Sequence, residues 1–251
     1  MRSVIAVALH EPARYPQEPL YLPVQAGAAL NPDMGVQRDD EGENISTRNL
    51  LYCELTVHYW LWKNADADAY GLCHYRRYFT CRPFGRKPDY ALIQSRLDRL
   101  LARADVLLPR PRLYLIETNY SQYAHAHRAA DLDAARRVIA EVSPDFLPAF
   151  DRVMKRRWGR RFNMFIMRRE PFEAYSAWLF GVLTALETRL APNAPPRTLG
   201  YIAERLMDVW VEQTRPRLRQ LRVLHTEGEN WPRKIAAFLK RKFTYVNSEK
   251  L

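Results

Sequence analysis

Short apolar runs alternate with longer amphipathic stretches along most of the chain. Short runs that are bounded by polar or turn-forming residues are typical of buried β-strands. The strands predicted in this way are Ser3–Leu9, Leu20–Ala26, Tyr70–Cys73, Val106–Leu108, Asn163–Met167 and Leu221–His225. Pro23 removes one backbone donor from the second strand, so we expect that strand at an edge or a bulge of the sheet.

Apolar residues at helical spacing mark the stretches between these strands. One such stripe predicts a helix with a buried face after Ser46, and its members are Leu51, Leu55, Tyr59 and Trp62. Further helices are predicted over Asp89–Arg103, Ser121–Glu141, Glu170–Leu190, Leu199–Glu212 and Arg233–Phe243. Strands that alternate with helices predict a layered α/β domain.

The chain has 251 residues, of which 47% are hydrophobic and 27% are charged, enough for one domain with a full core. No apolar run approaches the roughly 18 residues that span a bilayer, and the first residues lack a secretory cleavage pattern. Cys53, Cys73 and Cys81 have no metal-ligand spacing, and an odd number argues against a disulfide framework. We therefore expect a cytoplasmic protein with one domain over residues 1–230 and an appended basic segment over residues 231–251.

The net charge of +11 belongs to the second part of the chain. Residues 1–150 carry 18 basic and 18 acidic residues, whereas residues 151–251 carry 21 basic and 10 acidic residues. This asymmetry indicates an acidic partner, although the excess of arginine could instead reflect genomic base composition. In Arg233–Phe243, basic residues flank an apolar stripe. That pattern predicts contact with an anionic membrane surface, or else a packed helix with a solvated basic face.

The polar run His74-Tyr75-Arg76-Arg77 follows the third predicted strand. Ligands of α/β sheets usually bind beyond the carboxyl ends of strands. Arginine pairs bidentately with phosphate, and aromatic rings suit a ring-bearing ligand. Adjacent side chains of extended chain point to opposite faces, so we expect one of the two arginines to face the ligand. The alternative is a structural cluster of salt bridges under a loop.

Candidate polar residues also precede and follow the start of the first helix. Asn44 and Ser46 lie before a helix N-terminus, where free backbone N–H groups favour an anion, although Ser46 alone is better explained as an ordinary cap. Glu54 and His58 are one helical turn apart. They could form an acid–base pair or a structural pair near the surface.

Later helices and strands contribute three more candidates. His125 and His127 are two residues apart on a helix and diverge by roughly 200°, so they cannot both face one metal. Of the two, His127 is the better candidate for a ligand contact. Glu204 follows a polar loop and could act as a general base, with an ion-paired or solvated glutamate as the alternative. His225 ends the last strand and could ligate a metal or contact a diphosphate.

Several known catalytic motifs are missing from the sequence. There is no GxGxxG after a strand, no GxxxxGK[ST], no GxSxG and no HExxH. Asp66 and Asp68 have the spacing of a DxD motif, but they lie before a strand rather than at its carboxyl end. The sequence therefore excludes the standard dinucleotide and P-loop classes, and it predicts no metal site.

Longer segments of the chain resemble a known family. They are NIS-x-x-N-x-x-YCELT-x-x-YW-x-WKN, GLCHYRRYF, Q-Y-x-x-x-H before Asp131, FNMFIM with WLF, and GYIAERL-x-x-VW. From about His10 to Trp210 these segments resemble, in the same order, the bacterial capsular and exopolysaccharide-synthesis family long catalogued as a domain of unknown function. Its members are regarded as glycosyltransferases, and galactofuranosyltransferase activity is the best-supported example.

This resemblance implies a GT-A-like fold, a single-domain Rossmann-type sandwich, here with additional helices and a basic C-terminal helix. It implies that the first strand lies near the nucleotide, and that His74–Tyr78 lies where many GT-A enzymes carry a DxD motif. A basic cluster there would neutralise the leaving diphosphate without a metal, while a role for Mn²⁺ or Mg²⁺ stays open.

The resemblance also implies roles for single residues. Donor or diphosphate contacts are expected from His10, Asn44, Ser46, His74, Arg76 and Arg77, sugar or acceptor contacts from Tyr75, His127 and Asn163, and proton abstraction from Glu204.

The resulting hypothesis is a cytoplasmic glycosyltransferase that associates peripherally with the inner membrane through its basic C-terminal helix. It would transfer a sugar, with galactofuranose as the first candidate, from a UDP-sugar to a lipid-linked surface-polysaccharide acceptor, with inversion. The alternative is a non-catalytic carbohydrate-binding or scaffold protein of a polysaccharide assembly complex. Nucleic-acid binding rests on charge alone and is not expected.

Overall fold

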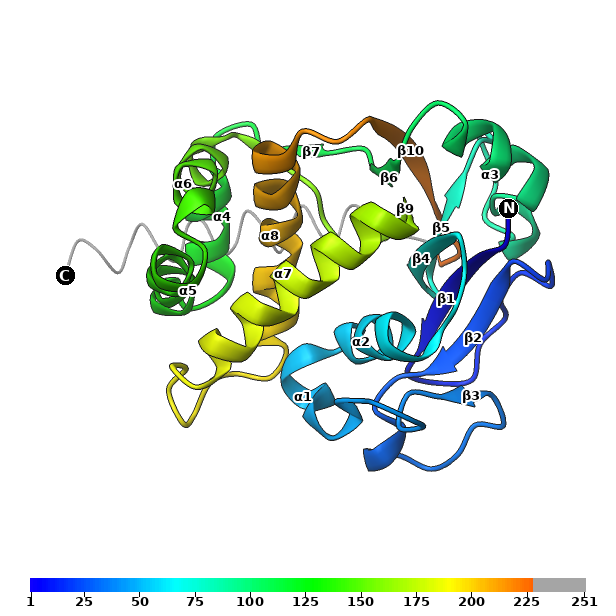
Figure 1. Cartoon of the computed structure of the whole chain (residues 1–251), viewed down its shortest axis with the longest axis horizontal. Helices are drawn as coiled ribbons and strands as arrows, with labels where there is room; N and C mark the ends of the chain where they lie inside the picture. Colours follow the sequence, from blue (N-terminus) through cyan, green and yellow to red (C-terminus); the bar gives the residue numbers. More distant parts are fainter. Residues whose placement is uncertain (228–251) are drawn as a thin grey trace.

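The computed structural model describes residues 1–227, which form a mixed sheet covered by helices (Figure 1). The strands are β1 (Ser3–Leu9), β2 (Tyr21–Gln25), β3 (Gln37–Arg38), β4 (Ala69–His74), β5 (Arg77–Thr80), β6 (Val106–Pro109), β7 (Arg112–Leu113), β8 (Trp158–Gly159), β9 (Phe165–Arg168) and β10 (Leu218–His225). The helices are α1 (Asn49–Tyr52), α2 (Leu55–Asn64), α3 (Gln94–Leu101), α4 (Asn119–Ala126), α5 (Ala129–Val142), α6 (Leu147–Lys155), α7 (Arg169–Glu187) and α8 (Thr198–Thr214). The predicted α/β class is confirmed, while the predicted segment 231–251 lies outside the described residues.

Three parallel strands form the centre of the sheet. Strand β1 pairs in parallel with β2 on one side and with β4 on the other, and Ala8 lies opposite His74. Beyond β4 the pairing continues through β9, β6, β10 and β5, and β5 returns to the end of β4 through a tight hairpin. Because β4 and β6 are each antiparallel to β9, the carboxyl ends of β1, β4 and β6 meet at one edge of the sheet.

Both faces of this sheet are buried. In β1, Ile5 and Val7 face a core built with α3 and β5, whereas Ala6 and Ala8 face the helices on the other side. This alternation is the period of two expected of a strand. A strand that is covered on both faces gives the continuous apolar run by which Ser3–Leu9 is recognised in the sequence.

The helices α4 to α8 form a layer beside the sheet (Figure 1). Helix α7 packs against α2 and α5, and α8 packs against α6 and α1. The apolar stripe predicted after Ser46 contributes to this packing, since the rings of Tyr59 and Trp62 lie 5.0 and 5.8 Å from that of Phe180. Within residues 1–227 the structure has no helix with the length and apolar character needed to span a bilayer.

Several elements differ in detail from the prediction. The helix after Ser46 is interrupted at Cys53, whose φ of 52° and ψ of −129° separate α1 from α2. The helix predicted over Ser121–Glu141 is likewise divided, because His127 is extended with φ −143°. The sequence pattern predicts neither helix α6 nor strand β5. Strand β5 directly continues the polar run after β4, so the sequence shows no boundary between that run and a new strand.

A buried ion pair joins the helical layer to the sheet. Arg160 and Asp208 are only 4% and 2% exposed, and the guanidinium pairs with the carboxylate. The same carboxylate accepts the backbone N–H of Arg160 at 2.8 Å. The Nε of Arg160 donates to the carbonyl of Pro109, at the end of β6, at 3.2 Å. Removal of either partner would leave an uncompensated charge in the interior.

We expect Asp208→Ala to lower the free energy of unfolding by about 3–5 kcal/mol, because Arg160 would remain charged and buried. Urea denaturation of the purified protein measures this loss. Glu212→Ala is the matched control, since Glu212 also lies on α8 but its partners Arg152 and Arg156 are partly exposed. For the control we expect a loss of at most about 1 kcal/mol. Equal losses in the two variants would contradict a special role for the buried pair.

Candidate functional site at the carboxyl edge of the sheet

Two histidines lie side by side at the carboxyl edge. His10 follows β1 and His74 ends β4, and their ring centroids are 5.9 Å apart. Burial, followed by the charge of Arg77, lowers the pKa of His74 to about 3, so its ring is neutral at physiological pH. The ring of Tyr75 stacks on that of His74 at 4.3 Å, and its hydroxyl donates to Glu11 at 2.7 Å. A neutral imidazole can donate one hydrogen bond and accept another.

The two arginines of the polar run have different surroundings. Arg76 lies between two exposed carboxylates, with distances of 2.7 Å to Glu11 and 2.8 Å to Glu227. The guanidinium carbon of Arg77 lies 4.1 Å from the ring centroid of Phe162, in the segment before β9. Of the two, only Arg77 faces the interior side of the carboxyl edge. Arg76 lies in the two-residue turn between β4 and β5 rather than in the extended chain that the sequence predicts.

A third arginine, Arg197, directly precedes α8 and also lies at this edge. Its backbone is left-handed, with φ 68°, and its N–H donates to the carbonyl of Leu50 at 2.8 Å. After desolvation, the charge of Arg197 is the next cause that lowers the pKa of His10, and it also contributes at His74. The sequence does not single it out, because it is one of many arginines and lies in a proline-rich loop.

One face of α8 binds the segment Arg160–Asn163 through three residues spaced four apart. The pairs are Gly200 with Asn163, Glu204 with Phe162, and Asp208 with Arg160. The donor–acceptor distances are 3.1, 3.1 and 2.8 Å in that order. Residues four apart share one helix face, so α8 fixes this segment almost residue by residue. We call this set of three contacts the α8 ladder.

Two carboxylates converge near Asn163. Glu204 accepts the N–H of Phe162 on Oε1 and pairs through Oε2 with the Nη1 of Arg205 at 2.7 Å. The Oε1 of Glu54 accepts from the Nδ2 of Asn163 at 2.9 Å, whereas its Oε2 accepts no hydrogen bond from residues 1–227. The Oδ1 of Asn163, which is 5% exposed, also has no partner in that part of the chain.

Strained backbone gathers at the same place. The non-glycine residues with positive φ in the described part of the chain are Cys53, Phe162, Arg197 and Arg215. All except Arg215, which follows α8, lie at the carboxyl edge. Such conformations cost about 1–3 kcal/mol each and persist where the surroundings fix them, often at functional sites. We name this cluster the carboxyl-edge site, and its members are His10, Cys53, Glu54, His74, Arg77, Phe162, Asn163, Arg197 and Glu204.

The thiol of Cys53 reports how closely the acidic members are placed. Burial is the main cause that raises its pKa to about 12, followed by the charge of Glu54, with Glu204 as a smaller cause. The thiol is therefore neutral and does not act as a nucleophile at physiological pH. The sequence pairs Glu54 with His58 rather than with Asn163, because the approach of Glu54 to Asn163 depends on the turn at Cys53.

A cavity of about 380 Å³ adjoins this site on the side of α4. It is lined by the proline pair before α8, by Tyr201 and by His127, whose imidazole stacks on the Tyr201 ring at 4.0 Å. Burial, followed by the charge of Arg205, lowers the pKa of His127 to about 4. Arg197 lies over the same tyrosine ring, 5.5 Å from its centroid, and so connects the cavity with the histidines of the site.

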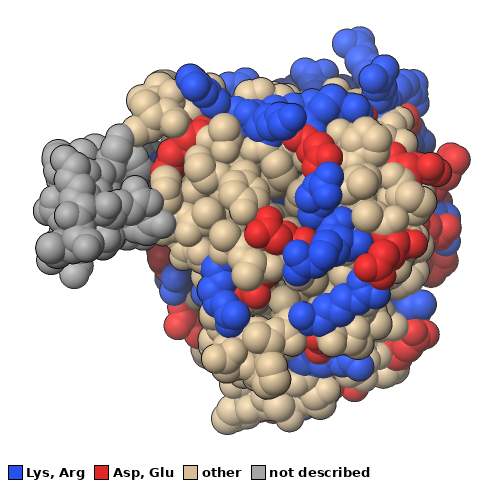
Figure 2. Space-filling model, turned by 90° about the vertical axis from the view of Figure 1, so that its left-hand side faces the viewer, with Lys and Arg blue, Asp and Glu red and all other residues tan. Residues whose placement is uncertain are grey.

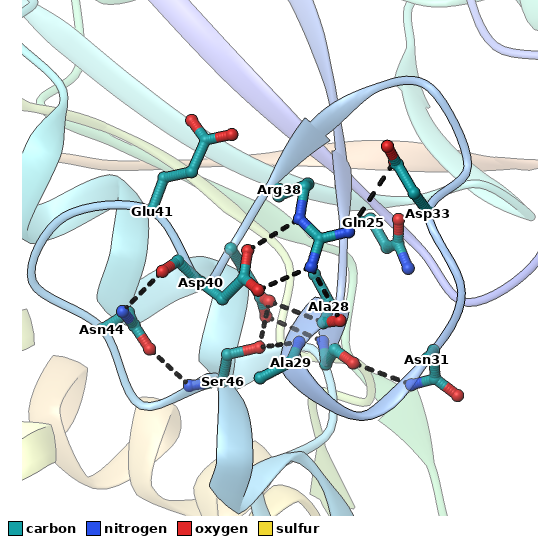
Figure 3. Close-up of polar contacts among 12 residues, drawn as sticks. Gln25, Ala28, Ala29, Asn31, Asp33, Arg38, Asp40, Glu41, Asn44 and Ser46 are labelled. Carbon is teal, nitrogen blue, oxygen red and sulfur yellow. Dashed lines mark hydrogen bonds and ion pairs between the residues drawn. The ribbon is translucent and has the colours of Figure 1, made fainter.

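Asn44 and Ser46 belong to a separate hydrogen-bonded loop (Figure 3). The Nδ2 of Asn44 donates to the carbonyls of Asp40 and Gly42, and its Oδ1 accepts the N–H of Ser46. The hydroxyl of Ser46 donates to the buried carboxylate of Asp39. Ser46 therefore does not cap the helix that follows it, contrary to the prediction. The polar atoms of both residues are engaged within the loop.

Other candidate groups are separated by the fold. Glu54 and His58 do not form a pair, because the ring of His58 is fully buried among aromatic rings and its Nε2 lies 2.8 Å from the Oγ of Ser176. Burial lowers the pKa of His58 to about 3. Asp66 lies at the amino edge of the sheet, where it pairs with Arg169 at 2.6 Å. A larger cavity, of about 1300 Å³, opens at that edge, away from the carboxyl-edge site.

The carboxyl-edge site holds more imidazoles and guanidiniums than carboxylates. No group of three or more His, Cys, Asp or Glu side chains in residues 1–227 is arranged to hold a metal ion. His225 meets the ring of Phe162 edge-on at 6.0 Å, beside the guanidinium of Arg77. Mg²⁺ and Mn²⁺ prefer carboxylate and other oxygen ligands, and the carboxylates of this site, Glu54 and Glu204, lie among imidazoles and guanidiniums.

Comparison with known proteins gives two matches. The family model described as a domain of unknown function (DUF4422) matches residues 4–215. The apo structure of WbbM, a bifunctional glycosyltransferase, matches with a TM-score of 0.83 at 28% identity, and the match covers 91% of this chain and 46% of that chain. The chain thus spans about half the length of that protein. The comparison with curated proteins finds no match.

Proposed function

The chain belongs to the family described as a domain of unknown function, DUF4422, and from its site we propose that it is a glycosyltransferase. The observation that carries this proposal is the carboxyl-edge site, where two guanidiniums and two imidazoles lie beside two carboxylates. The first set suits a diphosphate leaving group, and the second suits the deprotonation of a hydroxyl. The likeness to a bifunctional glycosyltransferase at 28% identity supports the same reaction class.

For the donor we propose a UDP-sugar, with galactofuranose as the first candidate sugar. Negative charge grows on the diphosphate as its bond to the sugar breaks, and fixed guanidinium donors stabilise that charge. Arg77 and Arg197 are the donors we assign to this role, with hydrogen bonds from His10 and His74. Arg76 is left as a secondary contact, because its guanidinium already lies between two carboxylates. The polar atoms of Asn44 and Ser46 already make hydrogen bonds within their own loop, so we assign these two residues to the support of that loop rather than to donor contacts.

We propose that no divalent cation is needed for this reaction. In glycosyltransferases with a DxD motif, a metal neutralises the leaving diphosphate. Here the run after β4 supplies Arg77, and the residue before α8 supplies Arg197. The two fixed charges would perform the same electrostatic function, which agrees with the poor match between the site and an oxygen-ligand metal.

For the general base we propose Glu54, with Glu204 as the alternative that the sequence predicts. A base needs a lone pair that can reach the acceptor hydroxyl. The Oε2 of Glu54 has no hydrogen bond within residues 1–227, whereas both oxygens of Glu204 are engaged. In the proposed step, the acceptor oxygen bonds to the anomeric carbon, its proton moves to Glu54, and the bond from that carbon to UDP breaks with inversion.

The acceptor and the sugar would occupy the space between Asn163 and His127. The Oδ1 of Asn163, which has no partner within residues 1–227, can accept a hydrogen bond from a sugar hydroxyl. The cavity beside His127 and Tyr201 offers aromatic faces of the kind that pack on sugar rings. We propose a lipid-linked glycan as the acceptor at the cytoplasmic face of the inner membrane. The basic segment 231–251, which the sequence predicts as a membrane anchor, lies outside the described residues.

The first test measures whether the purified protein turns over UDP-sugars. We expect release of UDP from UDP-galactofuranose in the presence of a polyprenyl-linked glycan acceptor, and we expect this rate to persist in excess EDTA. Coupled detection of UDP and mass spectrometry of the acceptor measure both. Binding of the glycan without turnover of any UDP-sugar would instead support the carbohydrate-binding or scaffold function. Loss of turnover in EDTA would contradict the proposal that no metal is needed, but it would leave the proposed glycosyltransferase activity standing.

We expect Arg77→Ala and Arg197→Ala each to weaken UDP binding by roughly 10- to 100-fold, the loss of a charge-assisted contact of about 1.5–3 kcal/mol. Isothermal titration calorimetry with UDP measures the change. Arg136→Ala is the control, because Arg136 pairs with Asp151 in the helical layer away from the site. We expect Arg76→Ala to weaken UDP binding less than Arg77→Ala does. Unchanged affinity in both site variants would remove the diphosphate role.

We expect Glu54→Gln to lower kcat by roughly 10²- to 10⁴-fold while UDP affinity stays near that of the wild type, because only proton abstraction is lost. Glu204→Gln keeps an oxygen for the N–H of Phe162, so we expect a smaller decrease, accompanied by reduced thermal stability. Steady-state kinetics and calorimetry on both variants separate the two carboxylates. A larger decrease in kcat for Glu204→Gln than for Glu54→Gln would identify Glu204 as the base.

A further inference from the structure

The loop between β6 and α4 exposes large apolar side chains in a row. Leu113, Leu115 and Ile116 are 65%, 81% and 58% exposed, whereas Tyr114 between them is 8% exposed. Single exposed apolar residues are common on soluble proteins and need no explanation. Three of them within four residues form a local patch, and such patches mark contacts with partners or membranes.

The backbone of this loop is held in place, so the exposed side chains cannot turn inward. The N–H of Tyr114 donates to the carbonyl of Arg157 at 2.7 Å, and its hydroxyl accepts from the Nε of Arg161 at 3.0 Å. Leu113 lies opposite Trp158 in the short β7–β8 pair. Tyr114 thus anchors the loop while its neighbours point outward. The patch is a built feature of the fold rather than an unpacked segment.

The surroundings of the patch are basic. Arg110 and Arg112 lie on the same loop and are exposed, as is Arg157 on the facing segment. The nearest acidic residue in the sequence, Glu117, is paired with His125 at 2.6 Å. Figure 2 shows lysine and arginine side chains along the upper rim of the molecule, the level at which β7 lies in Figure 1. The apolar tips are therefore framed by positive charge.

We propose that loop 110–116 docks this protein onto an anionic lipid bilayer. The leucine and isoleucine side chains would enter the acyl boundary, and the arginines would contact headgroup phosphates. The half-buried Trp158 and the partly exposed Tyr120 lie next to the loop, and such aromatic side chains favour the headgroup level. Charge complementarity favours a bilayer over a second copy of this chain, because two copies would bring the same arginines together.

The docking loop is tied to the carboxyl-edge site through one side chain. Arg161, which bonds Tyr114, directly precedes Phe162, and its charge contributes to the low pKa of His127 after burial and Arg205. The acceptor side of the site would therefore face the bilayer surface. This orientation rests on the proposed function, whereas docking itself does not. Docking through this loop is also distinct from attachment through residues 231–251.

The test is co-sedimentation of the full chain with phosphatidylcholine vesicles, with and without phosphatidylglycerol. We expect the wild type to bind the anionic vesicles, and the triple variant Leu113→Ser, Leu115→Ser, Ile116→Ser to bind at least about tenfold more weakly. Leu30→Ser with Leu50→Ser is the matched control, because these leucines are 55% and 64% exposed elsewhere on the surface. We expect the control to bind as the wild type does. Circular dichroism checks that all variants are folded.

A third variant tests whether the C-terminal segment accounts for vesicle binding. In the full chain, Lys240→Gln, Arg241→Gln and Lys242→Gln remove basic charge from the C-terminal segment and leave the loop intact. Vesicle binding that survives in this variant but is lost in the loop variant supports the proposal. Binding that survives in the loop variant, or absence of wild-type binding, overturns it.

Self-association of the wild type that the loop variant abolishes, without vesicle binding, would identify the patch as an interface between copies. UDP affinity of the loop variant stays unchanged if the carboxyl-edge site is intact, so docking and the proposed function can fail separately.

Discussion

The buried pair between Arg160 and Asp208 is the contact on which the site depends. It fixes the first residue of the segment that leads into β9, at the point where α8 passes the end of β6. The other two contacts of the α8 ladder follow at intervals of about one helical turn, from Glu204 to Phe162 and from Gly200 to Asn163. The positive φ of Phe162 can be sustained because its N–H is bound to Glu204 and its ring lies under Arg77. A buried ion pair outside the carboxyl-edge site thus helps to set the geometry of the residues within it.

The site combines positive charge with neutral rings. Arg77 and Arg197 approach the histidines from different elements. Burial is the main cause that lowers the pKa of both imidazoles; the charge of Arg197 adds to this at His10 and His74, and the charge of Arg77 adds to it at His74. The histidines therefore remain hydrogen-bonding groups, while the permanent charge stays on the arginines. Such a division suits a ligand whose own charge changes during a reaction, because the protein side does not have to titrate in response.

Local signals in the sequence predicted the elements, but they could not predict their meeting points. Strand β4 and the polar run after it are recognisable, since a buried run followed by charged residues indicates the end of a strand at a sheet edge. Arg197 carries no such local signal, and the local signal at Glu54 is its helical spacing from His58, with which it forms no pair. Arg197 and Glu54 reach the site only because Cys53 turns the chain between two helices and because a left-handed residue precedes α8. Asn44 and Ser46 are the opposite case. Their position before a helix is typical of an anion site, but in the structure their polar atoms bond to one another and to the surrounding loop.

The closed circuit of strands β4, β9, β6, β10 and β5 has a consequence for the behaviour of the protein in concentrated solution. Within residues 1–227, each of these strands pairs with two others, β5 with β4 only at the hairpin, and this leaves little unpaired backbone there to recruit another molecule. The opposite side ends in β3, which is only two residues long and includes Arg38, whose guanidinium is held by Asp40. Edge-to-edge aggregation is therefore discouraged on both sides of the sheet, by pairing on one and by brevity and charge on the other.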